Sequence, residues 1–284
     1  MIWRSPHGRP LPDWRSRTLI MGILNLTPDS FSDGGVALGV EPALARAAKL
    51  VAEGADILDL GAESTRPGAT PVSPAEELQR LLPALKAIRA QFPNLPLSVD
   101  TRNLSVAEAA ISAGADILND VQGAGLSDSS RPSLAALAAA TKAPWILMHN
   151  RKLPANESFW ESLIGDLQTA INHALNEGVD PSQLWLDPGF GFGKTVAQNL
   201  ALVSRLNRIT ALGYPVLLGT SRKSTLGAVL NEPDALKREP GDAACATWGI
   251  AQGAAMIRVH DVAALRPVIK MADALRYGKN WEAS

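Results

Sequence analysis

The sequence predicts a single (β/α)8 barrel, and three observations favour this fold. Eight short apolar runs alternate with helix-like stretches along the chain of 284 residues. A joint made of a helix end, a glycine and an immediate strand occurs at three places. A barrel of this kind takes roughly 250 residues, so the length fits one barrel with short additions.

The predicted elements follow one another in strand–helix order. Strands are expected at 19–24, 57–60, 97–99, 117–118, 145–148, 184–186, 216–218 and 256–259. Helices are expected near 41–53, 74–91, 104–113, 132–140, 159–177, 196–207, 222–230, 241–252 and 261–275. Strands that alternate with helices form βαβ units and a parallel sheet. Eight such strands favour a closed barrel over an open, doubly wound sheet.

The repeated joint supports this interpretation. Residues 53–60, 113–120 and 252–259 share the pattern of a helix end, Gly-Ala and an apolar strand. The glycine stands where a helix ends in the left-handed conformation, which glycine adopts without strain. Chance is the alternative, because Gly-Ala pairs are common in an alanine-rich chain.

Composition excludes several classes of protein. The net charge of −1 argues against general nucleic-acid or anionic-membrane binding, since both need a basic excess. We find no apolar run of about 18 residues and no signal-peptide pattern at the start. Cys245 is the only cysteine, so the chain can form no intrachain disulfide, which suits a reducing compartment. We expect Cys245 to be a small buried hydrophobe. The expectation is a cytoplasmic protein.

Polar side chains end every predicted strand except the second. The active site of such a barrel lies at the carboxyl ends of its strands. The residues found there are Asn25, Asp100, Asn119, His149, Asp187, the 219–224 segment, Arg258 and His260. A single Asp or Asn could be a helix N-cap. Lys223, Arg258 and His260 are poor caps, so a ring of such residues indicates a site.

These side chains suit two kinds of ligand. Asp100, Asn119 and Asp187 offer planar carboxylate and amide edges, which fit a flat heterocycle with an amino-amide edge. A second group, with Arg66, suits an anion such as a diphosphate; its other members are Lys223, Arg258 and His260. A helix that begins near 221–222 would add its N-terminal amides. No standard nucleotide-binding loop occurs, and the histidines lack metal-ligand spacing.

The motifs together resemble the dihydropteroate synthase family. They occupy residues 25–35, 54–56, 63–68, 98–101, 119–120, 147–149, 187–192, 221–224 and 258–262, in family order. The resemblance covers about 18–275, so we expect residues 1–17 to be an N-terminal extension and 18–284 to be the catalytic barrel.

The resemblance implies an activity. Members of this family join 6-hydroxymethyl-7,8-dihydropterin pyrophosphate to p-aminobenzoate and release pyrophosphate. It further implies Mg²⁺ on the diphosphate, a homodimer through the last helices and a p-aminobenzoate pocket that sulfonamide drugs also occupy. No nucleic-acid or membrane partner is expected.

The resemblance also implies residue roles. Asp100, Asn119, Asp187 and Lys223 would bind the pterin, and Arg258 would flank it. Asn25 would contact Mg²⁺. The diphosphate would be received by Thr65, Arg66, Arg258 and His260. The p-aminobenzoate pocket would be lined by Phe31, Pro67, Lys223 and Ser224. Asp33, on the first loop, and Val259 complete the expected substrate-binding set. Catalysis would depend on Asp100, Asp187, Lys223, Arg258 and His260.

Three points remain open at this level. The fifth loop departs from the family pattern, because Asn150-Arg151-Lys152-Leu153 follows His149. A pterin-binding methyltransferase domain with a corrinoid partner shares the barrel and the Asp and Asn contacts. A catalytically silent paralogue is the other alternative, although it would be expected to lose residues such as Arg66 or Lys223.

Overall fold

The computed structural model describes residues 3–27, 39–63, 72–121, 123, 134–152 and 158–278. An 8-stranded sheet has the order β6-β5-β4-β3-β2-β1-β8-β7, with every pair parallel. Its outer strands meet where Leu186 bridges Val216, and the Leu186 N–H donates to the Pro215 carbonyl at 3.0 Å. The sheet thereby closes into the predicted barrel.

The strands lie close to their predicted positions. They are β1 (Leu19–Asn25), β2 (Ile57–Gly61), β3 (Leu97–Asp100), β4 (Ile117–Asp120), β5 (Trp145–Met148), β6 (Leu184–Asp187), β7 (Leu217–Leu218) and β8 (Met256–Val259).

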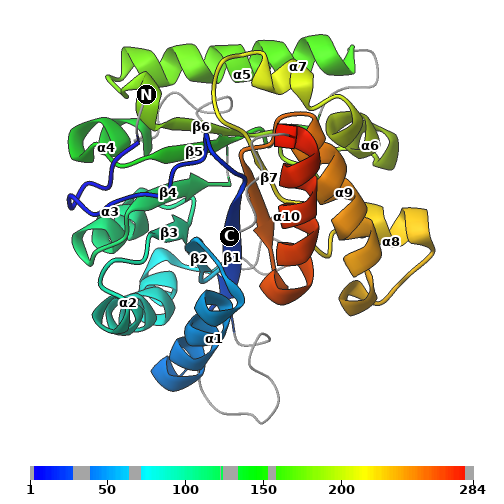
Figure 1. The fold of residues 1–284 in the computed structure, drawn as a ribbon. Coiled ribbons are helices and arrows are strands. Elements are labelled where there is room, and N and C mark those ends of the chain that lie inside the picture. The colour runs from blue at the N-terminus through cyan, green and yellow to red at the C-terminus, as the bar shows by residue number, and fades with distance from the viewer. Residues whose placement is uncertain are drawn as a thin grey trace.

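Helices surround the strands on their outer side (Figure 1). They are α1 (Val40–Glu53), α2 (Pro74–Gln91), α3 (Leu104–Ser112), α4 (Leu134–Thr141), α5 (Phe159–Asn176), α6 (Val196–Ser204), α7 (Asn207–Thr210), α8 (Ser224–Leu230), α9 (Glu239–Ala251) and α10 (Val262–Tyr277). Two details differ from the expectation. The helix expected at 196–207 ends at Ser204, and the helix expected from 222 begins at Ser224.

Alternation along each strand produces two apolar layers, because successive strand side chains point to opposite faces. One set fills the barrel interior, for example Met21, Ile57 and Trp185, which are fully buried. The other set, for example Leu58 and Leu60, packs beneath the helices. The same alternation turns the polar residues at the strand ends inward, above the inner apolar layer.

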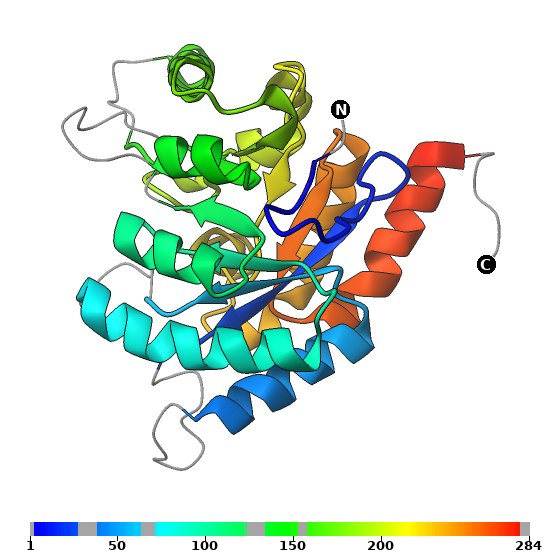
Figure 2. The same cartoon turned by 90° about the vertical axis from the view of Figure 1, so that its left-hand side faces the viewer.

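The N-terminal segment closes the barrel at the end where the strands begin. The Trp3 ring packs on Trp185 with centroids 4.6 Å apart, and Trp14 lies 5.8 Å from the same ring. Arg9 forms an ion pair of 2.9 Å with the buried Asp116. Figure 2 shows this segment, in dark blue, crossing that end of the barrel. The described part of 1–17 is thus packed against the barrel.

The glycine joints have the predicted conformation. Gly54, Gly114 and Gly253 have φ of 103°, 108° and 104°. The next residue in each case donates its N–H back into the preceding helix at 2.9–3.0 Å, for example from Ala55 to the Leu50 carbonyl. These contacts close each helix and start the strand at once. The prediction of three left-handed joints is confirmed.

Two composition-based expectations have a structural outcome. Among the described residues, no helix has the length and apolarity needed to cross a bilayer. Cys245 lies on α9 and is only half-buried, so the expectation of a buried residue was too strong. Burial and the neighbouring Asp242 raise the pKa of its thiol to about 11, which keeps the thiol protonated near neutral pH.

Candidate active site

The carboxyl ends of β3, β4, β6 and β8 bring the predicted pterin residues to one mouth of the barrel. Asp100 and Asp187 are the last residues of β3 and β6, and Asn119 is the third residue of β4. Arg258 is the third residue of β8. The register pairs Asp100 with Asn119, so these two side chains stand at the same height.

Arg258 is the centre of an ion-pair network inside the mouth. Its Nη2 lies 2.7 Å from Oδ2 of Asp100, and its Nε lies 2.6 Å from Oδ2 of Asp59. Asn119 donates its amide N–H to the same Asp59 oxygen at 3.0 Å. Oδ1 of Asp59 is buried and has no hydrogen-bond partner among the described residues. Asp59, which the sequence analysis did not single out, thus orients Arg258 and Asn119, and Arg258 in turn contacts Asp100.

Burial sets the charges of this network. It raises the pKa of Asp100 to about 7, against the opposing effect of Arg258, and it also raises the pKa of Asp187. Burial opposes the charge of Arg258 too, but Asp59 and Asp100 outweigh it and raise its pKa. The site therefore holds a permanent cation beside a carboxyl group that exchanges its proton near neutral pH.

Lys223 reaches the mouth from the loop after β7. It is the N-cap of α8, and its Nζ donates to the Phe190 carbonyl at 2.6 Å. The ammonium also lies 4.7 Å from the centre of the Phe192 ring. Burial lowers the pKa of Lys223 to about 8, although Asp187 and Asp100 act in the opposite direction. A residue with such a pKa can lose its proton under mildly alkaline conditions.

A second lysine holds the glycine-rich loop after β6. Lys194 Nζ lies 3.0 Å from Nδ1 of His149 and 3.1 Å from the carbonyl oxygens of His149, Gly189 and Phe192. Gly189 in turn donates its N–H to Oδ1 of Asp187 at 2.7 Å. Burial lowers the pKa of Lys194 to about 7 and that of His149 to about 4. The neutral imidazole therefore accepts at Nδ1 and donates from Nε2 to Asp166, 3.0 Å away.

The fifth loop, where the sequence departs from the family pattern, is tied to its neighbours. Asn150 donates its amide N–H to the Val121 carbonyl at 2.8 Å, which links the loops after β4 and β5. Arg151 forms an ion pair of 2.7 Å with Asp166 on α5, the residue that also receives His149. Asn150 and Arg151 thus tie the fifth loop to the loop after β4 and to α5.

Of the remaining predicted residues, some are described by the structure and the others lie outside the described residues. Asn25 ends β1, Ser224 is the exposed first residue of α8, and His260 follows β8. The Val259 side chain packs into the layer beneath the helices, so only its backbone can face the mouth. The others lie outside the described residues: Phe31, Asp33, Thr65, Arg66 and Pro67.

Sequence reasoning missed Asp59 and Lys194. Asp59 stands within an apolar strand, two positions from the inward Ile57, and that spacing was the available signal. Lys194 directly follows the glycine-rich segment, but nothing in the pattern shows that it turns back to hold it.

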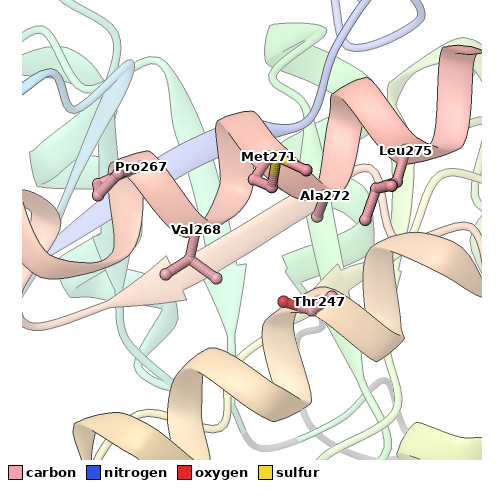
Figure 3. A pocket seen from close by; sticks show the side chains of 6 residues that line it. All are labelled: Thr247, Pro267, Val268, Met271, Ala272 and Leu275. Carbon is pink, nitrogen blue, oxygen red and sulfur yellow. The ribbon is translucent and has the colours of Figure 1, made fainter.

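One hollow on the described surface lies away from this mouth. It runs between α9 and α10 and is lined by Thr247, Pro267, Val268, Met271, Ala272 and Leu275 (Figure 3). The lining is almost entirely apolar, and the Leu275 side chain is 68% exposed. It offers none of the carboxylates or cations found at the strand ends.

Comparison with known proteins agrees with the fold and the site. The sequence profile of the pterin binding enzymes matches residues 21–260. Dihydropteroate synthase of Synechocystis is 45% identical over 277 residues, which are 95% of this chain and 94% of that protein. The Clostridium difficile dihydropteroate synthase solved with pteroic acid superposes with a TM-score of 0.87 at 41% identity, covering 93% of this chain and 99% of the other.

A further solved structure extends this likeness. The dihydropteroate synthase of Xanthomonas albilineans with 4-aminobenzoic acid has a TM-score of 0.85 and 41% identity, covering 92% of this chain and 93% of the other. Residues 21–260, which the family profile matches, include the carboxyl ends of all eight described strands. The chain belongs to the dihydropteroate synthase family of pterin binding enzymes.

Proposed function

We propose that this chain joins a dihydropterin pyrophosphate to p-aminobenzoate, with release of pyrophosphate. The observation that carries the proposal is the convergence of Asp100, Asn119, Asp187, Lys223 and Arg258 at one barrel mouth. Relatives that share two fifths of the sequence are dihydropteroate synthases, and solved ones hold pteroic acid or 4-aminobenzoic acid.

The pterin would be read by planar polar groups. Asp100, Asn119 and Asp187 face one space and offer acceptors and donors for the amino-amide edge of the ring. Asn119 is held by Asp59, and Asp187 is held by the Gly189 N–H, so both are oriented before a ligand arrives. Lys223 adds a cation beside Asp187.

The reaction needs a place for departing charge more than it needs a nucleophile. Pyrophosphate is already a leaving group, so the protein has to position the amine and stabilise the developing anion. Arg258 stays charged, because Asp59 and Asp100 raise its pKa. We assign the diphosphate to Arg258 and His260, together with Thr65 and Arg66 of the second loop, and the aryl amine to the side of Phe31, Pro67 and Ser224.

The residues present fit a magnesium ion on the diphosphate. Mg²⁺ keeps most of its waters and is commonly held by one or two protein oxygens plus substrate phosphates. Asn25 supplies one amide oxygen at the end of β1, and no cluster of three His, Cys, Asp or Glu side chains occurs among the described residues. The ion would neutralise charge on the leaving group.

A homodimer is the arrangement we propose in solution. Its support is the apolar surface of α9 and α10 around the groove of Figure 3, where Met271 and Leu275 are more than half exposed. Exposed apolar patches of this kind mark interfaces. Met271→Glu should yield monomers in sedimentation velocity. Leu236→Glu should not, because Leu236 is equally exposed but lies in the short 3-10 helix Ala235–Lys237, outside the groove. We also propose a cytoplasmic location, because a chain with a single cysteine suits a reducing compartment.

The test is pyrophosphate release from the pterin pyrophosphate with and without p-aminobenzoate, at millimolar Mg²⁺. Release that depends on p-aminobenzoate, with dihydropteroate formed in step, is the expected result. A sulfonamide should compete with p-aminobenzoate. Lys223→Ala should abolish turnover, whereas Lys237→Ala, at an exposed position, should not. Pterin binding without any release would contradict the proposal and favour the silent paralogue; methyl transfer to a corrinoid partner would favour the methyltransferase.

A further inference from the structure

The loop that follows β7 contains a strained residue next to a residue of the proposed site. Arg222 has φ of 61° and directly precedes Lys223. The left-handed conformation is unfavourable for a residue with a β-carbon, and it persists only where surrounding contacts hold it. Lys142 and Asn231, the other non-glycine residues of the described chain with positive φ, follow the ends of α4 and α8, where this conformation terminates helices. Arg222 precedes a helix, so helix termination does not explain its conformation.

Arg222 occupies the third position of a turn formed by residues 220–223. The Lys223 N–H closes this turn by donating to the Thr220 carbonyl at 3.2 Å. The direction in which the chain leaves the turn decides where the Lys223 side chain begins. From there its Nζ reaches the Phe190 carbonyl, 2.6 Å away. The left-handed residue therefore sets the path of Lys223 into the site.

Arg238 holds the carbonyl of the strained residue. It stands directly before α9 and donates from Nη1 to the Arg222 carbonyl at 2.9 Å. Its Nε donates to the Glu232 carbonyl at 3.1 Å, and its Nη2 donates to the Pro233 carbonyl at 2.7 Å. A guanidinium is planar and presents its donors in a fixed fork, so three carbonyls define both its position and its orientation. The Arg222 carbonyl belongs to the peptide that enters Lys223, and this peptide is thereby fixed.

Gly227 makes room for this guanidinium on α8. A β-carbon at Gly227 would lie 2.6 Å from Nη2 of Arg238 and 2.7 Å from its Cζ and Nε. Glycine inside a helix is otherwise unfavourable, because it loses more conformational freedom on folding than alanine does. The missing side chain lets Arg238 pack on the helix that begins directly after Lys223.

The first turn of α9 also holds the other side of the 220–223 turn. The Thr220 hydroxyl donates to Oδ1 of Asp242, a residue that is 3% exposed. The Asp242 N–H in turn donates to the Arg238 carbonyl at 3.0 Å. The start of α9 therefore contacts the turn twice, at the Thr220 hydroxyl and at the Arg222 carbonyl.

We propose that Arg238 is a positioning residue, which keeps Arg222 in its left-handed conformation and thereby holds the Lys223 ammonium at the mouth of the barrel. It acts through the backbone of Arg222 and needs no contact with a substrate. The geometry of this inference is independent of the proposed function, but its consequence for turnover rests on that function.

The first experiment measures the pKa of Lys223 in substrate-free protein. In carbon-13 NMR of lysine-labelled wild type, Lys223 should titrate at about 8, because burial lowers its pKa from the ordinary 10.5. The Lys223 signal is assigned by its loss in Lys223→Arg. Four charged groups act on this ammonium, and none of them is altered in the variants compared: Asp187, Arg258, Asp100 and Asp242. A shift of the pKa therefore reports movement of Lys223.

Arg238→Lys is the main variant. A lysine keeps the positive charge, but its single ammonium lacks the planar fork that meets three carbonyls. With the turn released, Lys223 should become more exposed, and its pKa should rise toward 10.5. Arg276→Lys is the matched control, since Arg276 donates to the Ala254 carbonyl at the same 2.9 Å, but at the end of the barrel where the strands begin. It should leave the pKa of Lys223 unchanged.

Gly227→Ala tests the same contact without altering Arg238. The new methyl group would displace the guanidinium, so the pKa of Lys223 should rise in this variant as well. Alanine favours the helix more than glycine does, so this rise would report position rather than a loss of stability. Gly165→Ala, on α5 with open space around it, is the control and should not alter the titration.

Kinetics supply a reading that a purely structural role would not produce. Arg238→Lys should lower kcat/KM by up to roughly a hundredfold, and the alkaline limb of its pH profile should move to higher pH together with the pKa of Lys223. In an Arg222→Gly background the same substitution should have a smaller effect, because glycine adopts the left-handed conformation without strain. Loss of stability alone would lower the amount of active enzyme and leave the alkaline limb in place.

Two results would overturn the inference. One is a Lys223 pKa that is the same in the wild type, Arg238→Lys and Gly227→Ala; the other is an equal shift in Arg276→Lys. The NMR titration requires no turnover. A protein that forms no dihydropteroate but shows the expected shift would contradict the proposed function alone, whereas turnover with an unchanged pKa of Lys223 in the variants would contradict this inference alone.

Discussion

The Arg258 guanidinium and the Asp59 carboxylate form an ion pair of 2.6 Å inside the barrel, although 199 residues separate them in the chain. Asp59 also receives Asn119, and Arg258 also contacts Asp100. The orientation of the proposed pterin site thus depends on a residue of β2 that stands one layer below the strand ends. This relationship leads to the first of four predictions.

Asp59→Asn should weaken both the fold and the site. It leaves the buried Arg258 charge with one partner fewer, and breaking a buried pair typically costs about 3–5 kcal/mol of unfolding free energy. Urea unfolding should show a loss of unfolding free energy near about 3 kcal/mol, because Asp100 still pairs with Arg258. Calorimetry should show pterin affinity reduced on the order of tenfold, equal to about 1.4 kcal/mol. Glu76→Gln breaks the exposed pair with Arg80 and should cost only a few tenths of a kcal/mol. Equal effects of the two variants would contradict this prediction.

The pH dependence of kcat/KM should follow Asp100 and Lys223. Burial raises the pKa of Asp100 to about 7, so its carboxylate forms as the pH rises through that value. Burial lowers the pKa of Lys223 to about 8, so its charge is lost as the pH rises further. If pterin binding needs both charges, kcat/KM should be bell-shaped, with its maximum between about 7 and 8.

Lys223→Arg provides the control for this profile. An arginine keeps its charge throughout this range, so any remaining activity should lose the alkaline decline while the acid limb stays in place. A wild-type profile that declines neither below about pH 7 nor above about pH 8 would show that neither ionisation governs binding to the free enzyme.

Gly189→Ala should disrupt the loop after β6. Gly189 has φ of 70°, and a β-carbon there would lie 1.9 Å from the His149 carbonyl oxygen. The left-handed conformation alone costs a side-chain-bearing residue roughly 1–2 kcal/mol. Since the Gly189 N–H orients Asp187, activity should fall together with thermal stability. Gly165→Ala, on α5 with open space around it, should instead raise stability by about 0.5–1 kcal/mol. A thermal melt of both variants checks the contrast.

Trp3→Ala should destabilise the barrel without altering the chemistry of the site. Trp3 is 2% exposed and packs on Trp185 at the end where the strands begin. Removing a buried tryptophan typically costs about 3–5 kcal/mol. Chemical unfolding should show that loss, while kcat of the folded fraction stays at the wild-type value. Leu236→Ala, at an exposed position, should change stability by less than about 0.5 kcal/mol. A selective loss of kcat in Trp3→Ala would mean that the N-terminal segment acts on the site.

Much of the fold could be predicted because it follows from local patterns. The apolar runs ended within a residue or two of the observed strands, and Gly54, Gly114 and Gly253 have the left-handed conformation that their position predicted. The start of α8 could not be placed as well, since Lys223 turns its side chain back to Phe190 and acts as the N-cap. Propensity does not report such a long-range contact.

The sequence by itself determined the barrel, the mouth that carries the site and most of the polar residues there, because strand periodicity and strand ends are local properties. Only the tertiary structure decided how those residues are charged and held. Asp59 forms an ion pair with Arg258, and the Lys194 ammonium lies within hydrogen-bond distance of three backbone carbonyl oxygens. The physical reason is that burial and hydrogen-bond partners, which set pKa and orientation, come from segments distant in sequence that only closure of the barrel brings together.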